Sequence, residues 1–116
     1  MKFQIKWTED AVEQYKKLKD AALAAKKARA RKGTAKQSNQ EGLFKQVAKT
    51  LKHLGGNPKH PGLATHEYTG IENPYNPKER VWEAYAQNAT PGAYRVFWCY
   101  GPKQGWITII AITPHP

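Results

Sequence analysis

Apolar residues recur at two different spacings along this chain, and each spacing predicts a different kind of element. In two segments they return every three or four residues, the period of a helix with one buried face. The first segment begins after Thr8 and extends past Ala25, with Gly33 as its expected end. The second follows a capping-box pattern at residues 38–41 and stops at Gly55-Gly56, just before Asn57-Pro58. The short polar connection between them predicts an antiparallel helical hairpin.

Elsewhere apolar residues crowd into short segments, partly in the alternating pattern of half-buried strands. One strand is expected before the first helix, where Phe3, Ile5 and Trp7 alternate with polar residues. Further strands are expected at residues 63–71, 80–87, 93–100 and 106–113. The order β-α-α-β-β-β-β predicts an α+β fold, with a two-helix hairpin packed on one face of a four- to five-stranded, mostly antiparallel curved sheet. A chain of 116 residues forms one core, so a single domain over residues 1–116 is expected.

The charge of the chain indicates the kind of partner it meets. Lys and Arg number 19 against 9 Asp and Glu, a net charge of +10. Such an excess favours contact with a polyanion such as RNA or DNA, although an anionic membrane surface or an acidic protein would also fit. A dense basic segment ends the first helix: Lys26, Lys27, Arg29, Arg31 and Lys32. It is either a phosphate-contacting patch or a solvated helix end whose cations favour the C-terminal dipole.

Composition also bears on redox state, location and cofactors. Cys99 is the only cysteine, so no intrachain disulfide forms, and its apolar strand predicts a buried thiol. The first residues contain no apolar signal core and no segment approaches the roughly 18 apolar residues of a membrane helix, so a cytoplasmic protein without membrane contact is expected. The four histidines are scattered at spacings that match no zinc site, so neither a metal nor a cofactor is expected.

Arg95 is the first candidate for chemistry, because it lies inside an otherwise aromatic and apolar strand. A buried arginine is costly unless it has a partner or faces a groove. We expect the sheet face that carries it to be the exposed, concave side, where its guanidinium would hold a scissile phosphate by a bidentate fork. The alternative is a structural ion pair with Glu83 or Glu67 across the sheet.

RNA can be cleaved without a metal, because its own 2′-hydroxyl supplies the nucleophile. The protein then has to move two protons and stabilise the charged phosphorane. The catalytic candidates are Arg95, His115, His66 and Glu67. His115 is a general acid or base, or else a frayed terminal residue. His66 and Glu67 point to opposite faces of a strand, so at most one of them faces the site.

A second set of residues is suited to contact RNA rather than to transfer protons. Lys59 and His60 would meet phosphates at the entry of a strand, or they are ordinary loop residues. Tyr68 would stack on a base, or it belongs to the core. The complete set of RNA-binding candidates is Lys59, His60, Tyr68, Arg80, Lys26, Lys27, Arg29, Arg31 and Lys32.

Four segments carry a resemblance that spans nearly the whole chain: residues 57–68, 81–85, 94–98 and 109–115. With these, the sequence resembles the RelE/ParE toxin superfamily, including RelE-, YoeB- and HigB-like toxins of type II toxin–antitoxin systems. The resemblance implies two helices on a curved antiparallel sheet. For the RelE branch it implies an mRNA interferase that enters the ribosomal A site. Arg95 matches the phosphate-binding arginine of the family, and His115 lies near its C-terminal acid–base histidine.

The resemblance also implies partners and leaves other functions open. Lys59, His60, His66 and Glu67 lie where other members carry basic or acidic active-site groups. A cognate antitoxin is the expected protein partner, with mRNA and the ribosome as the targets of translation inhibition. A ParE-like inhibitor that binds DNA gyrase and cuts nothing is an alternative. A non-catalytic RNA- or ribosome-binding module is another.

Overall fold

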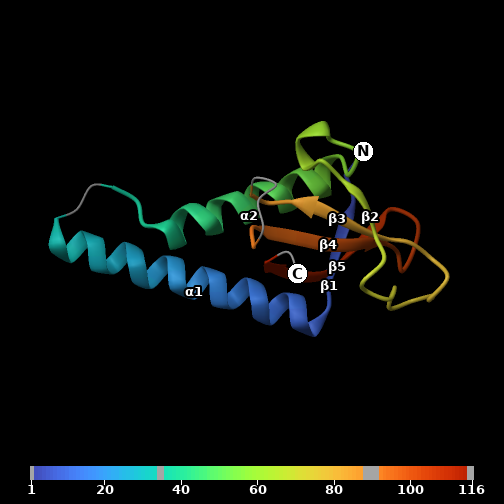
Figure 1. Ribbon diagram of the computed structural model, residues 1–116, viewed down its shortest axis with the longest axis horizontal. Coiled ribbons are helices and arrows are strands. Elements are labelled where there is room, and N and C mark those ends of the chain that lie inside the picture. The colour runs from blue at the N-terminus through green and yellow to red at the C-terminus, as the bar shows by residue number, and fades with distance from the viewer. Residues whose placement is uncertain (1, 34–35, 88–91, 115–116) are drawn as a thin grey trace.

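The computed structural model describes residues 2–33, 36–87 and 92–114, and its elements follow the expected order (Figure 1). The helices are α1 (Glu9–Lys32) and α2 (Asn39–Gly56), followed by the short 3₁₀ turn η1 (Pro61–Leu63). The strands are β1 (Gln4–Trp7), β2 (His66–Tyr68), β3 (Val81–Tyr85), β4 (Tyr94–Tyr100) and β5 (Trp106–Pro114). The predicted α+β fold, with both helices against one sheet, is confirmed.

Both helices begin and end at the residues that the sequence signals indicate. The Thr8 hydroxyl accepts a hydrogen bond from the Ala11 N–H, and Gly33 ends α1 with a φ of 69°, in the left-handed region that glycine tolerates. At the start of α2, Ser38 and Glu41 form both bonds of the capping box. Among the described residues, neither helix combines the length and the hydrophobicity that a membrane span requires.

The five strands form one mixed sheet in the order β1-β5-β4-β3-β2. β1 runs parallel to β5, and the other neighbouring strands are antiparallel. The register of β4 on β5 shifts between Phe97 and Trp98, where Phe97 pairs with Ala111 but Trp98 pairs with Ile109. Such a bulge bends a strand and increases its twist, which gives the sheet local curvature.

The strand expected at residues 63–71 is wrong at both ends, since only His66–Tyr68 pairs with β3. Before it, His60 caps the η1 turn by accepting a hydrogen bond from the Gly62 N–H at 2.9 Å. Ala64 then takes a φ of 48°, which turns the chain into the strand. After Tyr68 the chain leaves the sheet for a loop over residues 69–80, which the apolar pattern alone does not distinguish from a strand.

One face of the sheet and both helices enclose an apolar core. Its buried members come from β3, β4, β5, α1, α2 and η1: Ala11, Val47, Leu51, Leu54, Leu63, Ala84, Val96, Trp98, Ile107, Ile109 and Ile112. Burial of these side chains is the main favourable term in folding. Both helices therefore lie on the side of the sheet where this apolar stripe predicts them.

The opposite face differs from the prediction, because it is buried rather than exposed. Arg95 has 3% of its surface accessible, and Phe97 and Cys99 are also buried. Tyr68 of β2 and the loop after β2 cover part of this face: the Tyr68 ring lies 4.7 Å from the Phe97 ring, and the Tyr75 hydroxyl of the loop contacts Thr108 Oγ1 at 2.7 Å. This packing also explains the buried Cys99 thiol, whose pKa burial raises to about 11.

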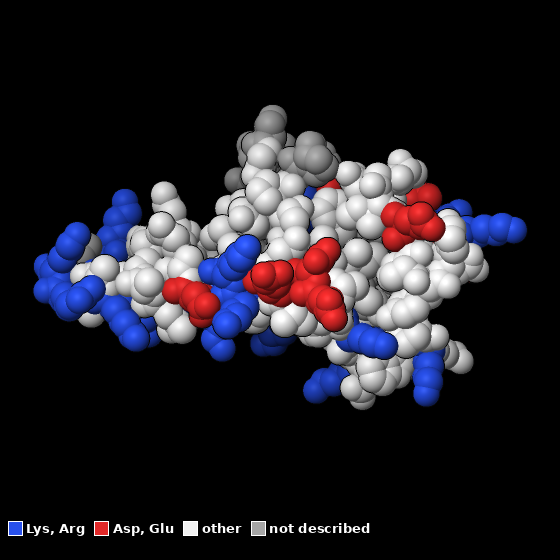
Figure 2. Space-filling view, turned by 90° about the horizontal axis from the view of Figure 1, so that it is seen from below, with Lys and Arg blue, Asp and Glu red and all other residues white. Residues whose placement is uncertain are grey.

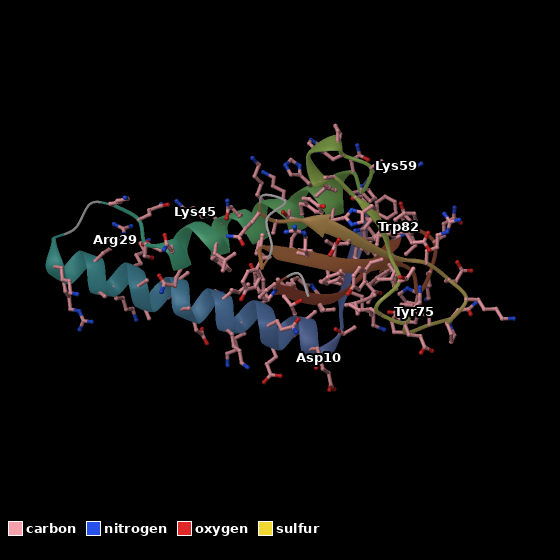
Figure 3. All side chains as sticks on the ribbon, viewed as in Figure 1. Asp10, Arg29, Lys45, Lys59, Tyr75 and Trp82 are labelled. Carbon is pink, nitrogen blue, oxygen red and sulfur yellow. The ribbon has the colours of Figure 1, made fainter. Side chains whose placement is uncertain are left out.

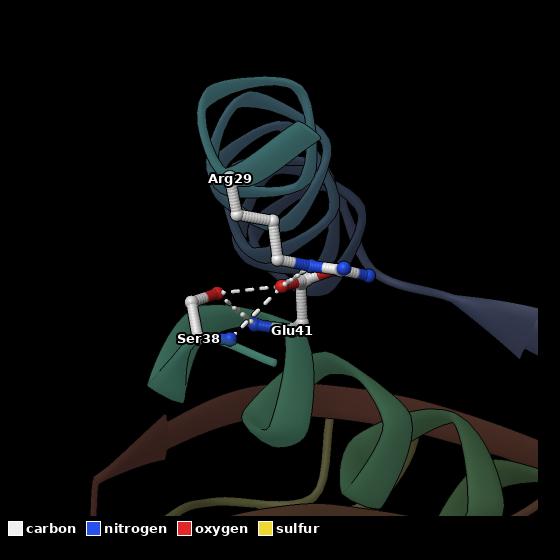
Figure 4. Close-up of polar contacts among 3 residues, drawn as sticks. All are labelled: Arg29, Ser38 and Glu41. Atoms are coloured by element: carbon white, nitrogen blue, oxygen red, sulfur yellow. Dashed lines mark hydrogen bonds and ion pairs between the residues drawn. The ribbon is translucent and has the colours of Figure 1, made fainter. Parts of the chain in front are cut away.

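The helical hairpin extends far beyond the sheet, which gives the molecule principal extents of 51 × 28 × 26 Å (Figure 1). Close to its tip, Arg29 Nε of α1 donates to Glu41 of α2 at 2.8 Å (Figure 4). The Arg29 hydrogen bond and the Ser38 N–H lower the pKa of the Glu41 carboxyl from its ordinary 4.5 to about 2. The capping box of α2 and the contact between the helices therefore share one carboxylate.

Candidate functional site

Three neighbouring strands bring a group of polar side chains together on the sheet face that lies away from the helices. In the register of the sheet, His66 of β2 lies opposite Glu83 of β3, and Tyr85 of β3 lies opposite Arg95 of β4. Side chains two residues apart on a strand share a face, so Glu83 and Tyr85 point the same way. We call these four residues, His66, Glu83, Tyr85 and Arg95, the polar cluster.

His66 and Glu83 form the ionisable half of the polar cluster. His66 Nε2 lies 2.5 Å from Glu83 Oε1, and His66 Nδ1 lies 3.2 Å from the Ala64 carbonyl oxygen. Two oxygen atoms therefore face the two ring nitrogens, which fixes the orientation of the ring. The Glu83 side chain is fully buried, whereas 45% of the His66 side chain is exposed. His66 is thus the member of the pair that a substrate can reach from solvent.

Tyr85 connects the histidine to the arginine. The Arg95 guanidinium carbon lies 3.9 Å from the centre of the Tyr85 ring, a cation–π contact, and Arg95 Nη1 donates to the Tyr94 carbonyl oxygen at 3.1 Å. The edge of the His66 ring meets the same tyrosine, with 5.5 Å between the ring centres. A rigid aromatic ring therefore holds the cation and the histidine at a fixed spacing.

The polar cluster combines the groups that phosphodiester cleavage without a metal requires. A histidine hydrogen-bonded to a buried carboxylate can exchange a proton with a hydroxyl, because the carboxylate fixes the ring and stabilises its charge. A guanidinium stabilises the charge that develops on phosphate oxygens. In the part of the chain that the structure describes, no group of three or more His, Cys, Asp or Glu could hold a metal ion.

The other predicted residues near β2 separate onto two faces. Glu67 lies opposite Trp82 and pairs with Arg80 at 3.8 Å, so it points away from the polar cluster. Tyr68 shares the face of His66 but packs on Phe97, further along the sheet. The structure therefore brings His66, and not Glu67, to Arg95.

Lys59 and His60 lie on the turn after α2, on the helix side of the sheet. Lys59 is exposed, whereas the His60 ring stacks on His53 with 4.1 Å between ring centres. Burial and the neighbouring positive charges of His60, Lys49 and Lys52 lower the pKa of His53. These two candidates are not part of the polar cluster.

The basic segment lies at the far end of the hairpin from the polar cluster. Figure 2 shows Lys and Arg gathered at this tip, and acidic side chains nearer the middle of the same face. Lys26, Lys27, Arg31 and Lys32 are exposed, and Arg29 is engaged by Glu41. His115 lies outside the described residues, so its predicted role stays a prediction. The last described residue of β5, Pro114, pairs with Tyr94, next to Arg95.

Sequence reasoning did not assign a chemical role to Glu83 or Tyr85. The signal for Glu83 was present, because it is a charged residue at the centre of a strand, as Arg95 is. Glu83 would have been found if every charged residue inside an apolar strand, and not only the arginine, had been taken as a candidate. Tyr85 carries no such signal, since an aromatic residue in a strand is ordinary.

No protein-family model matches this chain, and a comparison with curated protein sequences gives no match. Solved structures do match it. A YoeB/ParE toxin from Agrobacterium tumefaciens aligns with a TM-score of 0.60 at 7% identity, over 97% of this chain and 99% of that one. A chain of an archaeal RelE–RelB complex from Pyrococcus horikoshii aligns with a TM-score of 0.56 at 14% identity, over 98% of this chain and 96% of that one. YoeB from a Staphylococcus aureus dimer aligns with a TM-score of 0.55 at 12% identity, over the full length of both chains.

Proposed function

We propose that this chain, which has the fold of the RelE, YoeB and ParE toxins, is the toxin of a toxin–antitoxin pair and acts as an mRNA endonuclease. The observation that carries the proposal is the polar cluster, in which a guanidinium and a histidine–carboxylate pair contact one tyrosine ring. The fold alone is compatible with several activities, because sites and not folds determine function.

In the proposed reaction the 2′-hydroxyl of the RNA attacks the adjacent phosphorus. The O2′–P bond forms and the P–O5′ bond breaks, which leaves a 2′,3′-cyclic phosphate and a 5′-hydroxyl. The 2′-hydroxyl gives its proton to the base and the 5′-oxygen receives one, so no co-reactant is needed. We assign proton transfer to the His66–Glu83 pair, with His115 as a second acid–base group from the sequence argument, and charge stabilisation to Arg95.

Burial of Arg95 adds a requirement to this mechanism. Only 3% of its surface is accessible, so a phosphate reaches the guanidinium only after neighbouring side chains move. His66 is exposed and contacts both Glu83 and the Tyr85 ring, which makes it the entry point of the cluster. We infer that the RNA target orders the site, and the ribosomal A site is the environment in which we propose this occurs.

The physiological partner in this proposal is a cognate antitoxin. One similar solved structure is a RelE–RelB complex, and the net charge of +10 favours an acidic partner. Cytoplasmic mRNA and the ribosome are the proposed targets.

The proposal is tested by adding the protein to a translating extract and mapping new mRNA 5′ ends. Cuts within codons that need active ribosomes, and that disappear with Arg95→Ala, are expected. An extract in which translation continues and no cuts appear would overturn the nuclease assignment. Inhibition of DNA supercoiling by gyrase is then measured, because one similar structure is a YoeB/ParE toxin and binding alone would not need the His66–Glu83 pair.

A further inference from the structure

The helix side of the sheet carries a concave surface that is separate from the polar cluster. A cavity of about 680 Å³ lies between the turn at residues 58–65 and the strands β3 and β4. Trp82, Trp98 and Tyr100 form its aromatic lining. The Trp82 and Trp98 rings lie 28° from parallel with 6.2 Å between centres, and Tyr100 meets Trp98 edge-on at 5.0 Å. Trp82 follows the opposite strand parity to Glu83, so this surface and the polar cluster lie on different faces.

Two residues that line this cavity carry buried polar atoms without hydrogen-bond partners among the described residues. They are the indole N–H of Trp98 and the hydroxyl of Thr65. Trp98 is 1% exposed. An unsatisfied buried donor costs roughly the desolvation of the group, so native proteins rarely keep one without a reason. A donor and a hydroxyl beside an aromatic wall are suited to the polar edge of a planar ligand.

Lysine and arginine side chains line the surface next to this cavity, at the same end of the sheet. A second cavity of about 450 Å³ borders the first at Trp82 and Tyr100, and we call the two cavities together the aromatic groove. The charged side chains that line it are Lys59, Lys78, Arg80, Lys103 and Glu79. The guanidinium carbon of Arg80 lies 5.9 Å from the Trp82 ring centre. Figure 3 shows Lys59 and Trp82 at the same end of the sheet, far from Arg29 at the hairpin tip.

We propose that the aromatic groove binds nucleotide units of single-stranded RNA. A base stacks on Trp82 and Tyr100, and Lys59 and Arg80 meet the flanking phosphates. The Trp98 N–H and the Thr65 hydroxyl are buried, so the polar edge of the base bonds them only after neighbouring side chains move. Stacking on aromatic faces beside a positive groove is the general mode of single-strand binding. Four lining cations against one carboxylate select a polyanion over an acidic or neutral peptide. The proposal deepens the proposed function, which supplies RNA as the source of the nucleotide, but binding does not depend on cleavage.

The test measures fluorescence anisotropy of a labelled 2′-O-methyl oligoribonucleotide, which cannot be cleaved because its 2′-oxygen is blocked. The salt is ~0.15 M, so that unspecific attraction is screened. Trp82→Ala is expected to weaken binding about tenfold and Trp82→Phe to retain most of it, since loss of one stacked base has this size. Across a salt series, Lys59→Gln and Arg80→Gln should each reduce the slope of log affinity against log salt by about one, whereas Lys17→Gln, an exposed position on α1 outside the groove lining, should not.

Thr65→Val distinguishes a ligand contact from a structural role. Valine keeps the shape of threonine and removes an unsatisfied buried hydroxyl, so the melting temperature should stay the same or rise. Binding should nevertheless weaken a few-fold. A merely structural Thr65 would leave binding unchanged, and that result would overturn the assignment of the hydroxyl to the ligand.

Competition with free nucleotides distinguishes an RNA strand from a free nucleotide as the ligand of the groove. Uridine and adenosine monophosphates that displace the oligonucleotide at micromolar concentration would indicate a free nucleotide site and overturn the strand assignment. Equal binding by folded Trp82→Ala, Trp82→Phe and the unaltered chain would overturn the groove itself. If the variants change binding as expected but the protein cuts no mRNA, the groove proposal stands and only the nuclease proposal is rejected.

Discussion

The charged side chains of the hairpin tip are mostly exposed, whereas those of the polar cluster on the sheet contact one another or a shared ring. At the tip, four of the five cations of the basic segment are exposed, and the fifth, Arg29, pairs with Glu41. On the sheet, one arginine, one histidine and one glutamate contact each other or a shared ring, two of them buried. A run of charged residues in a sequence therefore indicates an exposed charged surface. Single charged residues inside apolar strands indicate side chains that are held in place by specific contacts.

The largest expected effect tests the sheet side of this comparison. Arg95→Lys keeps the charge but loses the planar fork and its contact with the Tyr85 ring. We expect the rate of mRNA cleavage to fall about 10²- to 10³-fold, the usual effect of removing one donor that stabilises transition-state charge. The rate of appearance of mapped 5′ ends measures it, with circular dichroism to confirm folding. A folded variant that cuts at the normal rate would separate Arg95 from the chemistry.

Substitution in the apolar core should affect stability and spare the site. Leu54 of α2 is fully buried against the sheet, so Leu54→Ala should lower the free energy of unfolding by about 2–5 kcal/mol. Leu23 on the hairpin is 47% exposed, and Leu23→Ala serves as the matched control with a change within about 0.5 kcal/mol. Urea unfolding measures both. Equal losses would mean that the hairpin surface is as well packed as the core.

Neutralising the hairpin tip should have a smaller and less specific effect. The variant replaces Lys26, Lys27, Arg31 and Lys32 by Gln and keeps Arg29 for its contact with Glu41. Affinity for RNA should fall about two- to tenfold, alike for all sequences, with a shallower salt dependence. Filter binding across a salt series measures it. A change in the positions of the cuts would instead assign the tip a role in selecting the target.

The fold was predictable from the sequence because its signals are local. The Thr8 cap, the capping box at residues 38–41 and the terminal Gly33 each depend on contacts within a few residues, and all three are confirmed. The strand at residues 63–71 was wrong because residues 61–64 form a capped turn, and the chain then leaves the sheet after Tyr68.

The site was only partly predictable, because its geometry depends on contacts between distant segments. Arg95 and His66 were found as unusual residues, but their shared contact with Tyr85 follows from strand register, which a single sequence does not specify. The expected exposure of the Arg95 face failed for a similar reason. Tyr75 belongs to a loop, and nothing in its local sequence shows that it folds back 33 residues away onto Thr108.

The smallest expected effect is a loss of stability at acidic pH, and it concerns the ion pair between Arg29 and Glu41 near the hairpin tip. Glu41 has a pKa of about 2 in the folded chain, against an ordinary value of 4.5, chiefly because Arg29 donates to it. A folded-state pKa below the unfolded one means that the carboxylate stabilises the fold above pH 4.5. That contribution is lost as the pH falls from 4.5 towards 2.

Glu41→Gln isolates this charge, since glutamine can still accept the Ser38 N–H in a capping box. The urea midpoints of the two proteins should differ by a constant amount between pH 7 and about pH 5, and converge below that. Other carboxylates titrate in both proteins, so their effect cancels in the difference. A gap that stays the same at about pH 3 would show that Arg29 and Glu41 hold the hairpin by shape rather than by charge, and the tip would then be a basic surface with no electrostatic anchor to the second helix.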